Sequence, residues 1–254
     1  MLIYGHLPTA SELSVYKTRL QGMRALPQAL KDVLERIPAS AHPMDVMRTG
    51  CSMLGNLEIE VDFSGQIDAI DRMIAIFPSI ICYWYRFSHD GIRVETETAD
   101  ESVAGHFLHM LNDKSPNDVH QRCMDVSLIL YAEHEFNAST FTGRVCASTL
   151  TDIHSCVTAA IGCLRGPLHG GANEAAMDMI KDWTSVEQAE AETMAMLERK
   201  DKIMGFGHAV YTTHDPRNAL IKTWSEKLAA DVGDTTLYPV SCKVEEVMWR
   251  EKKL

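Results

Sequence analysis

Apolar residues recur at helical spacing along most of this 254-residue chain, and they seldom alternate as they would in a half-buried strand. Residues 66–86 predict one long apolar helix with a bend at Pro78. Residues 119–134 predict a helix with one apolar side, and residues 145–164 predict a buried central helix because they are apolar on nearly all sides. Only residues 92–98 alternate, and we interpret them as an ordered loop or an isolated strand. The pattern therefore predicts a mostly α-helical protein with about ten helices.

Signals for the beginning of a helix recur between these segments. Residues 9–12 and 185–188 each form a capping box, in which the side chains of the first and last residues satisfy backbone donors of the first turn. Further helix starts are marked by prolines near a first turn, at Pro43, Pro116 and Pro216. A modest shift towards Glu and Lys after Asn173 indicates a second subdomain, without any repeat of fixed period.

The composition is that of an ordinary globular enzyme, with 46% hydrophobic and 23% charged residues. The net charge of -11 argues against binding to nucleic acid or to an acidic membrane surface, although a local basic pocket can still receive an anionic substrate. No apolar run reaches membrane-spanning length, because the most apolar segment, residues 73–85, is short and contains Pro78. The first residues lack the basic region and cleavage site of a signal peptide.

The seven cysteines are odd in number and include no Cys-x-x-Cys pair. Most of them lie in apolar helical stretches. This pattern predicts reduced, buried thiols in a cytoplasmic protein rather than disulfides or a zinc site. The cysteines are Cys51, Cys82, Cys123, Cys146, Cys156, Cys163 and Cys242.

The most specific chemical signal is a pair of histidines next to glycines. His169 lies in Gly-Pro-Leu-His-Gly-Gly-Ala-Asn-Glu, residues 166–174, and His208 ends Gly-Phe-Gly-His, residues 205–208. Glycine removes side-chain bulk and accepts a positive φ, so such loops bring an imidazole and backbone amides close to a ligand. Two of them, each next to a predicted helix, indicate a site for a polar and anionic small molecule.

For the other histidines the ordinary expectation is a hydrogen-bonded interior or surface residue. His134 is an exception because of a motif discussed below. Metal ligation by His134, His169 and His208 is a weaker alternative, since no pair of them has the spacing typical of metal ligands. The ordinary expectation applies to His6, His42, His89, His106, His109, His120, His154 and His214.

Arg217 follows Asp215 and Pro216 at a predicted helix start. A guanidinium is electrostatically unfavourable at the positive end of a helix, so an anion should compensate its charge. Two anions fit this requirement. One is a neighbouring acid such as Asp215, and the other is a carboxylate of a ligand, held by two parallel hydrogen bonds.

Taken together, these motifs resemble those of the citrate synthase family, and the resemblance covers essentially the whole chain in the same order. Within the family, they are most similar to the branch that makes 2-methylcitrate. The motifs that carry the resemblance are residues 42–50, Tyr83-Trp84-Tyr85, residues 105–109, Tyr-Ala-Glu-His-Glu-Phe-Asn-Ala-Ser-Thr at residues 131–140, residues 164–174, Gly-Phe-Gly-His at residues 205–208, Val-Tyr-Thr at residues 210–212 and Asp-Pro-Arg at residues 215–217.

The resemblance implies an all-α homodimer, with part of a large helical domain in residues 1–170 and part of a small domain in residues 171–254. It implies condensation of propionyl-CoA with oxaloacetate through an enol or enolate, followed by hydrolysis to 2-methylcitrate and coenzyme A. The implied reaction needs no metal or redox cofactor, since coenzyme A enters as part of the substrate. The implied dimer contacts come from apolar helices such as residues 66–86 and 145–164.

The resemblance also assigns roles to individual residues of this chain. His169 would bind the thioester carbonyl, and His208 would polarise the ketone of oxaloacetate and protonate its oxygen. His134 and Arg217 would hold oxaloacetate. The residues implied in backbone contacts to coenzyme A are Leu168, Ile203, Gly205 and Gly207.

Two departures from the family pattern stand out. The family's catalytic aspartate and its C-terminal arginines are expected beyond Leu254, and a further N-terminal part is expected before Leu2, so we expect this sequence to be a piece of a longer enzyme without an assigned base. Thr212 stands where many members carry a basic residue for the phosphate of coenzyme A. Arg199, Lys200 and Lys202 are alternative phosphate ligands or simply a solvated basic run.

Three other functions remain open at this stage. A citrate synthase using acetyl-CoA differs by one methylene in the acyl pocket, which is worth only about 1–3 kcal/mol. A noncatalytic ligand-binding or dimerisation module would explain the missing base. A hydrolase with a histidine-ligated metal would require bound metal.

Overall fold

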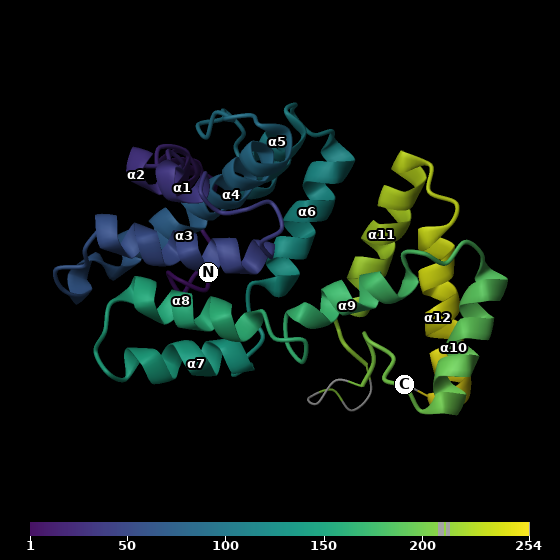
Figure 1. Ribbon diagram of the computed structural model, residues 1–254. Helices are drawn as coiled ribbons and strands as arrows, with labels where there is room; N and C mark the ends of the chain where they lie inside the picture. Colours follow the sequence, from purple (N-terminus) through teal and green to yellow (C-terminus); the bar gives the residue numbers. More distant parts are fainter. Residues whose placement is uncertain (208–210, 212–213, 254) are drawn as a thin grey trace. The chain divides into compact units, whose positions relative to one another are not determined.

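The computed structural model describes residues 1–207, 211 and 214–253, and within them every regular element is helical. It contains twelve α-helices and one short 3-10 helix in that part of the chain (Figure 1), which confirms the predicted all-α class. Residues 92–98 form an irregular loop rather than a strand. The chain forms two compact units, residues 1–121 with 133–165, and residues 122–132 with 166–254. The predicted domain boundary at residue 170 stays a prediction.

The first unit contains seven complete α-helices and the short helix η1. These are α1 (Ala10–Gln21), α2 (Gln28–Leu34), α3 (Pro43–Leu57), η1 (Phe63–Gly65), α4 (Gln66–Asp90), α5 (Val103–Asn112), α7 (Ala138–Ala147) and α8 (Ile153–Leu164). The predicted long helix is present as α4, which runs unbroken through Pro78 and ends at Gly91, whose φ of 72° forms a left-handed cap. Helix α6 (Asp118–Tyr131) begins in this unit and continues in the second.

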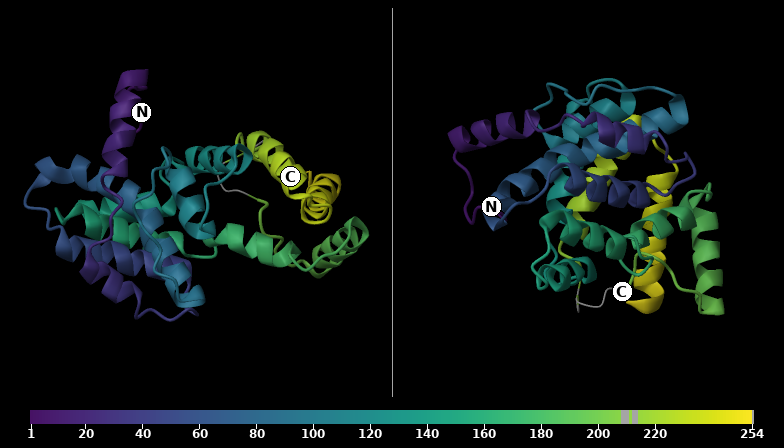
Figure 2. Two further views of the ribbon diagram at one scale, coloured as in Figure 1. Left: turned by 90° about the horizontal axis from the view of Figure 1, so that it is seen from above. Right: turned by 60° about the vertical axis from the view of Figure 1, so that its left-hand side comes forward.

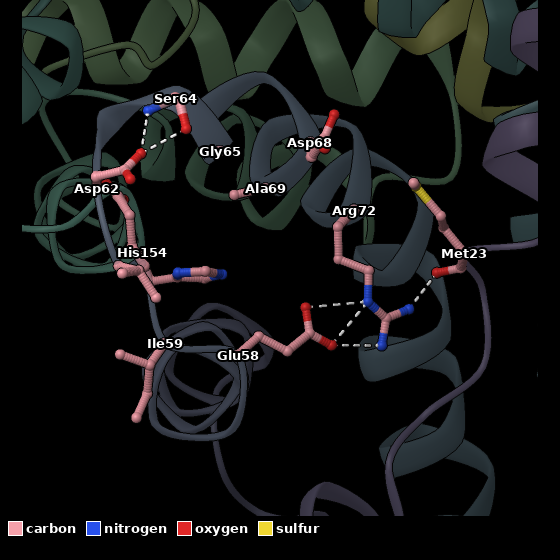
Figure 3. Close-up of a pocket in the computed structure, with 12 residues that line it drawn as sticks. Met23, Glu58, Ile59, Asp62, Ser64, Gly65, Asp68, Ala69, Arg72 and His154 are labelled. Carbon is pink, nitrogen blue, oxygen red and sulfur yellow. Dashed lines mark hydrogen bonds and ion pairs between the residues drawn. The ribbon is translucent and has the colours of Figure 1, made fainter.

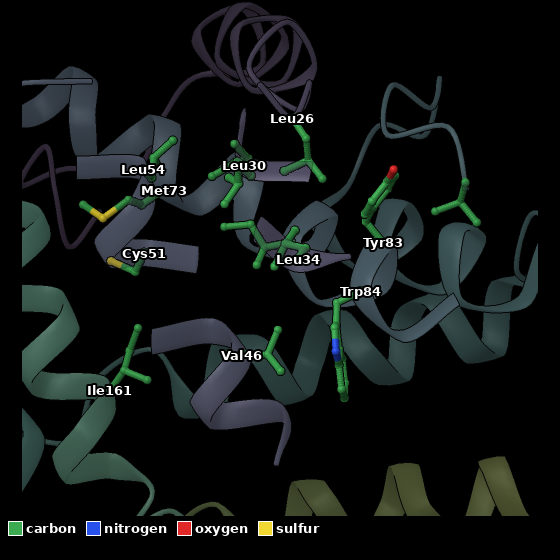
Figure 4. Packing of buried hydrophobic residues seen from close by; sticks show 13 residues of the cluster. Leu26, Leu30, Leu34, Val46, Cys51, Leu54, Met73, Tyr83, Trp84 and Ile161 are labelled. Carbon is green, nitrogen blue, oxygen red and sulfur yellow. The ribbon is translucent and has the colours of Figure 1, made fainter. Parts of the chain in front are cut away.

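The core of the first unit lies between α2, α3, α4 and α8 (Figure 4). Tyr83 and Trp84 of α4 are its largest members, and each has a polar atom that needs a partner. The Tyr83 hydroxyl donates to a Glu35 carboxylate oxygen at 2.7 Å, and the Trp84 indole donates to the Ile37 carbonyl at 3.2 Å. These two bonds bind the connection after α2 to the centre of α4.

The loop before α5 is held by buried polar groups rather than by apolar contacts. The guanidinium of Arg24 donates to the carbonyl oxygens of Thr98, Asp100 and Ser102 at 2.9, 2.7 and 3.3 Å. His106 is fully buried, and its two ring nitrogens lie 3.1 Å from the Ser79 hydroxyl and 3.0 Å from the Thr98 hydroxyl. These buried groups of Arg24 and His106 therefore have partners, which explains how an irregular segment stays ordered.

The predicted single helix over residues 145–164 is wrong, because the structure has two antiparallel neighbours, α7 and α8, packed side by side (Figures 1 and 2). The hydroxyls of Ser148 and Thr149 donate to carbonyls of the last turn of α7. Leu150 then adopts a φ of 62°, and the Asp152 carboxylate accepts the Ser155 amide to begin α8. Short polar side chains that compete for backbone groups end a helix in this way. Helix α7 is also largely exposed rather than central.

The second unit has a smaller core. Its helices are the later part of α6, α9 (Gly171–Ile180), α10 (Val186–Arg199), α11 (Asn218–Val232) and α12 (Leu237–Lys252). Helices α10 and α12 pack against each other and bury Ala189, Val240, Val244 and Met248. Ile203 joins this cluster from the loop after α10.

The structure also bears on the predictions about the cysteines and about membrane-spanning segments. All seven cysteines are free thiols, and Cys51, Cys82 and Cys156 are buried whereas the other four are half-buried. Burial raises the pKa of Cys82 to about 12, which keeps this thiol protonated. In the described part of the chain, no helix combines the length and the apolar character that crossing a membrane requires.

His106 makes the stability of the first unit depend on pH. Its pKa is lowered to about 3, mainly because burial disfavours the imidazolium and secondly because Arg24 repels it. An unfolded histidine binds its proton near pH 6.5, so on acidification the unfolded state gains a proton that the folded state does not. We expect the free energy of unfolding to fall between about pH 6.5 and pH 3, by up to about 1.4 kcal/mol per pH unit from this group.

Urea unfolding at about pH 7 and about pH 5, followed by circular dichroism, measures this dependence. His106→Gln is expected to be less stable at neutral pH. Its free energy of unfolding should also depend less on pH, because the contribution of this group is lost. His89→Gln, at an exposed position, is the matched control and should keep the slope of the parent chain. An unchanged slope in His106→Gln would contradict the assignment.

Candidate functional site

The His169 loop forms a tight turn at the beginning of α9. The His169 amide donates to the Gly166 carbonyl at 2.9 Å, and the Gly171 amide donates to the same oxygen at 3.2 Å. The His169 carbonyl then accepts the Ala172 amide at 3.0 Å. This double turn places the half-buried His169 two residues before the first residue of α9.

The N-terminal end of α9 carries the positive end of the helix dipole. Its cap, Gly170, provides no side-chain acceptor, so the electrostatic field of the helix is not compensated by a capping side chain. A positive helix end disfavours the protonated form of a nearby imidazole. The helix predicted beside His169 is present as α9, and its first turn also carries the acidic Glu174.

The glycine loop after α10 is fixed by two apolar side chains. Ile203 is buried in the core of the second unit, and Phe206 packs against the same cluster. Gly205 lies between these two residues and Gly207 follows them. Their φ values are 95° and 78°, which residues other than glycine rarely adopt. A methyl group on Gly205 would lie 3.8 Å from the Ala176 side chain, so this loop runs beside α9.

Two anions were considered for Arg217, a neighbouring acid and a ligand carboxylate, and in the structure the anion is the neighbouring Asp215. Its guanidinium forms a two-pronged ion pair with Asp215, with Nη2 at 2.6 Å from Oδ2 and Nε at 3.0 Å from Oδ1. The Arg217 amide also donates to Asp215 Oδ1 at 2.9 Å. The hydrogen bonds that the guanidinium donates to Asp215 hold the pKa of Arg217 above its ordinary value. Helix α11 begins one residue later, so the guanidinium lies at a helix start as predicted.

His134 lies in the connection between α6 and α7 rather than at the end of a helix. The predicted helix over residues 119–134 ends at Tyr131, and Glu135 adopts a φ of 53°. The His134 carbonyl accepts the Asn137 side-chain amide at 3.5 Å, and Asn137 caps α7. His134 is half-buried in the first unit.

The structure brings most of the predicted site residues into the second unit. This unit contains the exposed Leu168, His169, the glycine loop and Arg217. His134 belongs to the first unit, and His208 lies outside the described residues. The individual roles stay predictions, as does the absence of a metal. The described residues contain no group of three metal-ligating side chains.

One contact in this region was not foreseen. The Asn173 side-chain amide on α9 donates to the Tyr131 hydroxyl at the end of α6, at 3.1 Å. Both residues stand in the recognised motifs, but their separation of 42 positions gives no sequence signal for pairing. The bond ties the start of α9 to the end of α6 within the second unit.

Comparisons with known proteins agree with these motifs. The model of the citrate synthase family described as "Citrate synthase, C-terminal domain" matches residues 1–254. The chain is 68% identical over 254 residues to a 2-methylcitrate synthase of Shewanella oneidensis, covering 100% of this chain and 68% of that protein. It is 38% identical to a citrate synthase of Deinococcus radiodurans, covering 97% of this chain and 66% of that protein.

The fold agrees as well. A citrate synthase of Thermoplasma acidophilum, solved in a ternary complex with carboxymethyl coenzyme A and oxaloacetate, superposes with a TM-score of 0.89 at 29% identity. The match covers 98% of this chain and 66% of that chain. The present chain thus spans about two thirds of the length of these relatives.

The glycine loop provides a test of the local geometry. Gly207→Ala is expected to destabilise by about 1–2 kcal/mol, because its φ of 78° is strained for any L side chain, while no atom of the described residues lies within 4 Å of the added methyl group. Gly65→Ala is the control, since that site is equally open but has a φ of -83°. Urea unfolding of both variants measures the difference, and equal effects would refute the strained geometry.

Proposed function

Because the chain belongs to the citrate synthase family, a family of transferases, we propose that it forms the larger part of a 2-methylcitrate synthase. The reaction joins propionyl-CoA to oxaloacetate and uses one water molecule to release 2-methylcitrate and coenzyme A. The observation that carries this proposal is the 68% identity to a 2-methylcitrate synthase over the full chain, against 38% to a citrate synthase. The matching motifs of both histidine loops support it.

His169 is the proposed electrophile for the thioester. A base removes a proton from the carbon next to the thioester carbonyl, and negative charge develops on the carbonyl oxygen. A ring N–H of His169 donates to that oxygen and stabilises the enol or enolate. The position of His169 before α9 supports this role, since the helix dipole favours the neutral donor over the imidazolium. We assign no residue of this sequence to the base.

The carbon–carbon bond then forms between the enol carbon and the ketone carbon of oxaloacetate. The ketone oxygen gains the negative charge, and His208 is proposed to polarise it beforehand and to supply the proton. Water finally attacks the thioester carbonyl, the carbon–sulfur bond breaks, and coenzyme A leaves as the thiol. These steps balance without an oxidant, a reductant or a resident cofactor.

Arg217 and His134 are proposed to hold oxaloacetate. A guanidinium binds a carboxylate through two parallel hydrogen bonds, and Asp215 already occupies that geometry in the structure. An incoming carboxylate therefore either uses the remaining donors of Arg217 or displaces Asp215. In both cases Asp215 holds the guanidinium in place before the ligand arrives, which reduces the ordering cost of binding.

The loop after α10 is proposed to receive coenzyme A through its backbone. The Ile203 side chain is buried, so only its main chain is available to a ligand. Gly205 and Gly207 leave the surface of the loop free of side chains, which permits close approach of the adenine and pantetheine groups. Leu168 offers a further main-chain contact from the His169 turn.

The wider setting follows from the same proposal. Coenzyme A enters and leaves as part of a substrate, so no metal or redox cofactor is required. A homodimer is proposed on the family resemblance, with contacts from α4, α7 and α8. Seven free thiols in one chain favour a reducing compartment, so we propose a cytoplasmic location.

The acyl preference tests the proposed reaction. Thiol release with oxaloacetate should be faster with propionyl-CoA than with acetyl-CoA, although one methylene limits the difference to about 10–200-fold. A preference for acetyl-CoA would replace the proposal by citrate synthase. If neither thioester reacts but oxaloacetate still binds, the chain acts as a ligand-binding module, which is the second alternative.

Arg217→Ala tests the oxaloacetate site separately from turnover. Loss of a charged, two-pronged contact should weaken oxaloacetate binding by about 10–100-fold in calorimetry. Arg250→Ala is the matched control, since Arg250 forms exposed ion pairs with Glu190 and Glu251 in the same unit. Comparable affinities of the two variants would remove Arg217 from the site.

A further inference from the structure

The first unit contains a pocket of about 500 Å³ that the proposed reaction does not use (Figure 3). Its walls come from the connection between α3 and α4, from the first turns of α4 and from the start of α8. None of the predicted site residues lines it. Its volume lies in the range of small-molecule pockets.

His154 lines this pocket and differs from the ordinary expectation for a histidine. The residue is 2% exposed, and neither ring nitrogen has a hydrogen-bond partner among the described residues. The expectation of a hydrogen-bonded histidine is therefore wrong at this position. A buried polar group without a partner is destabilising, so its presence calls for a physical explanation.

His154 packs closely against Gly55 on α3. A methyl group at Gly55 would lie 2.7 Å from the Cβ atom of His154 and 3.6 Å from its Nδ1. The backbone of α3 thus lies close to the base of the His154 side chain, where a residue with a side chain would collide. Figure 3 shows the ring extending into the pocket, towards the side where Glu58 lies.

The pocket carries a surplus of acids, although Asp68 is paired with Arg19, whose Nη2 lies 2.6 Å from Asp68 Oδ1. Glu58, Glu60, Asp62 and Asp68 line it, and Arg72 is the only lysine or arginine among its lining residues. Arg72 is itself paired with Glu58, with Nη2 at 2.9 Å from Oε1. Glu60 accepts the backbone amide of Ile153 at 2.7 Å, which holds a carboxylate at the residue next to His154. An anionic ligand would be repelled here, whereas a cation would be attracted.

We propose that this pocket binds a small organic ammonium ion, with an N–H of the ligand donating to a ring nitrogen of His154 and the surrounding carboxylates balancing its charge. The unpartnered imidazole and the surplus of acids are both explained by such a ligand. The described residues hold no group of three side chains suited to a metal ion, which directs the proposal to an organic cation. The site is separate from the proposed reaction.

The probe is 1,4-diaminobutane, titrated into the 254-residue chain at neutral pH while the histidine ring signals are followed by nuclear magnetic resonance. Butane-1,4-diol, which has the same length without charge, and succinate, which has the opposite charge, are the comparison compounds. We expect a saturable shift of the His154 ring signal with the diamine alone. Equal or stronger binding of succinate or the diol would overturn the proposal.

Two variants decide where the diamine binds. His154→Leu should weaken its affinity by about tenfold or more, as for the loss of a hydrogen bond to a charged group. Val61→Lys adds a cation at an exposed position of the pocket wall and should weaken the affinity as well, while Val15→Lys adds the same charge on α1, away from the pocket. Both valines are exposed, at 92% and 67%, so neither change disturbs the core.

The valine pair keeps the test decisive if His154→Leu fails to fold. Weaker binding in Val61→Lys than in Val15→Lys supports the proposed pocket. Equal affinities in these two variants, or the absence of a saturable shift in the parent chain, would refute it. Neither outcome bears on the proposed reaction, because the residues proposed for thiol release do not line this pocket.

Discussion

The candidate site depends first on the anchoring of the glycine loop in the second unit. Ile203 and Phe206 pack into the small core that α10 and α12 form, and they hold the intervening backbone where only glycine fits well. The apolar contacts offset the entropy of ordering a segment without large side chains of its own. The same segment passes Ala176 of α9, so the core that stabilises the unit also positions the loop beside the helix that follows His169.

Arg217 shows how charge is balanced at the start of α11 in the same unit. A guanidinium at the start of α11 opposes the helix dipole, and Asp215 compensates it through a two-pronged ion pair. Because the side chains are only partly buried, the pair remains accessible to competition by water and ligands.

Local sequence signals predicted many helix starts because the relevant interactions span only a few residues. Thr9 and Ser185 cap α1 and α10 as expected, and His42 caps α3 immediately before Pro43. The break between α7 and α8 was missed because apolar periodicity continues across it. Only the hydroxyl and carboxylate bonds of residues 148–152 reveal that the backbone leaves the helix there.

Long-range contacts explain the limits of prediction at the candidate sites. The family motifs identified His169, Arg217 and the glycine loop, since each is a short continuous stretch. The pairing of Tyr131 with Asn173 depends on how α6 and α9 pack within the second unit, and no local pattern encodes it. His154 looked like one more polar residue in an apolar helix until the contact with Gly55 and the acidic wall placed it in a pocket.

The two regions have opposite local chemistry in a chain whose net charge is -11. The site proposed in the second unit combines a helix dipole, an arginine and two glycines, and each of these features favours anions against the overall field. In the first unit, the acidic pocket adds to that field and favours cations. The global charge therefore does not predict the proposed anion site, because interactions at contact distance exceed the screened field of distant charges. Binding specificity in this protein has to be argued pocket by pocket, from the groups that line each one.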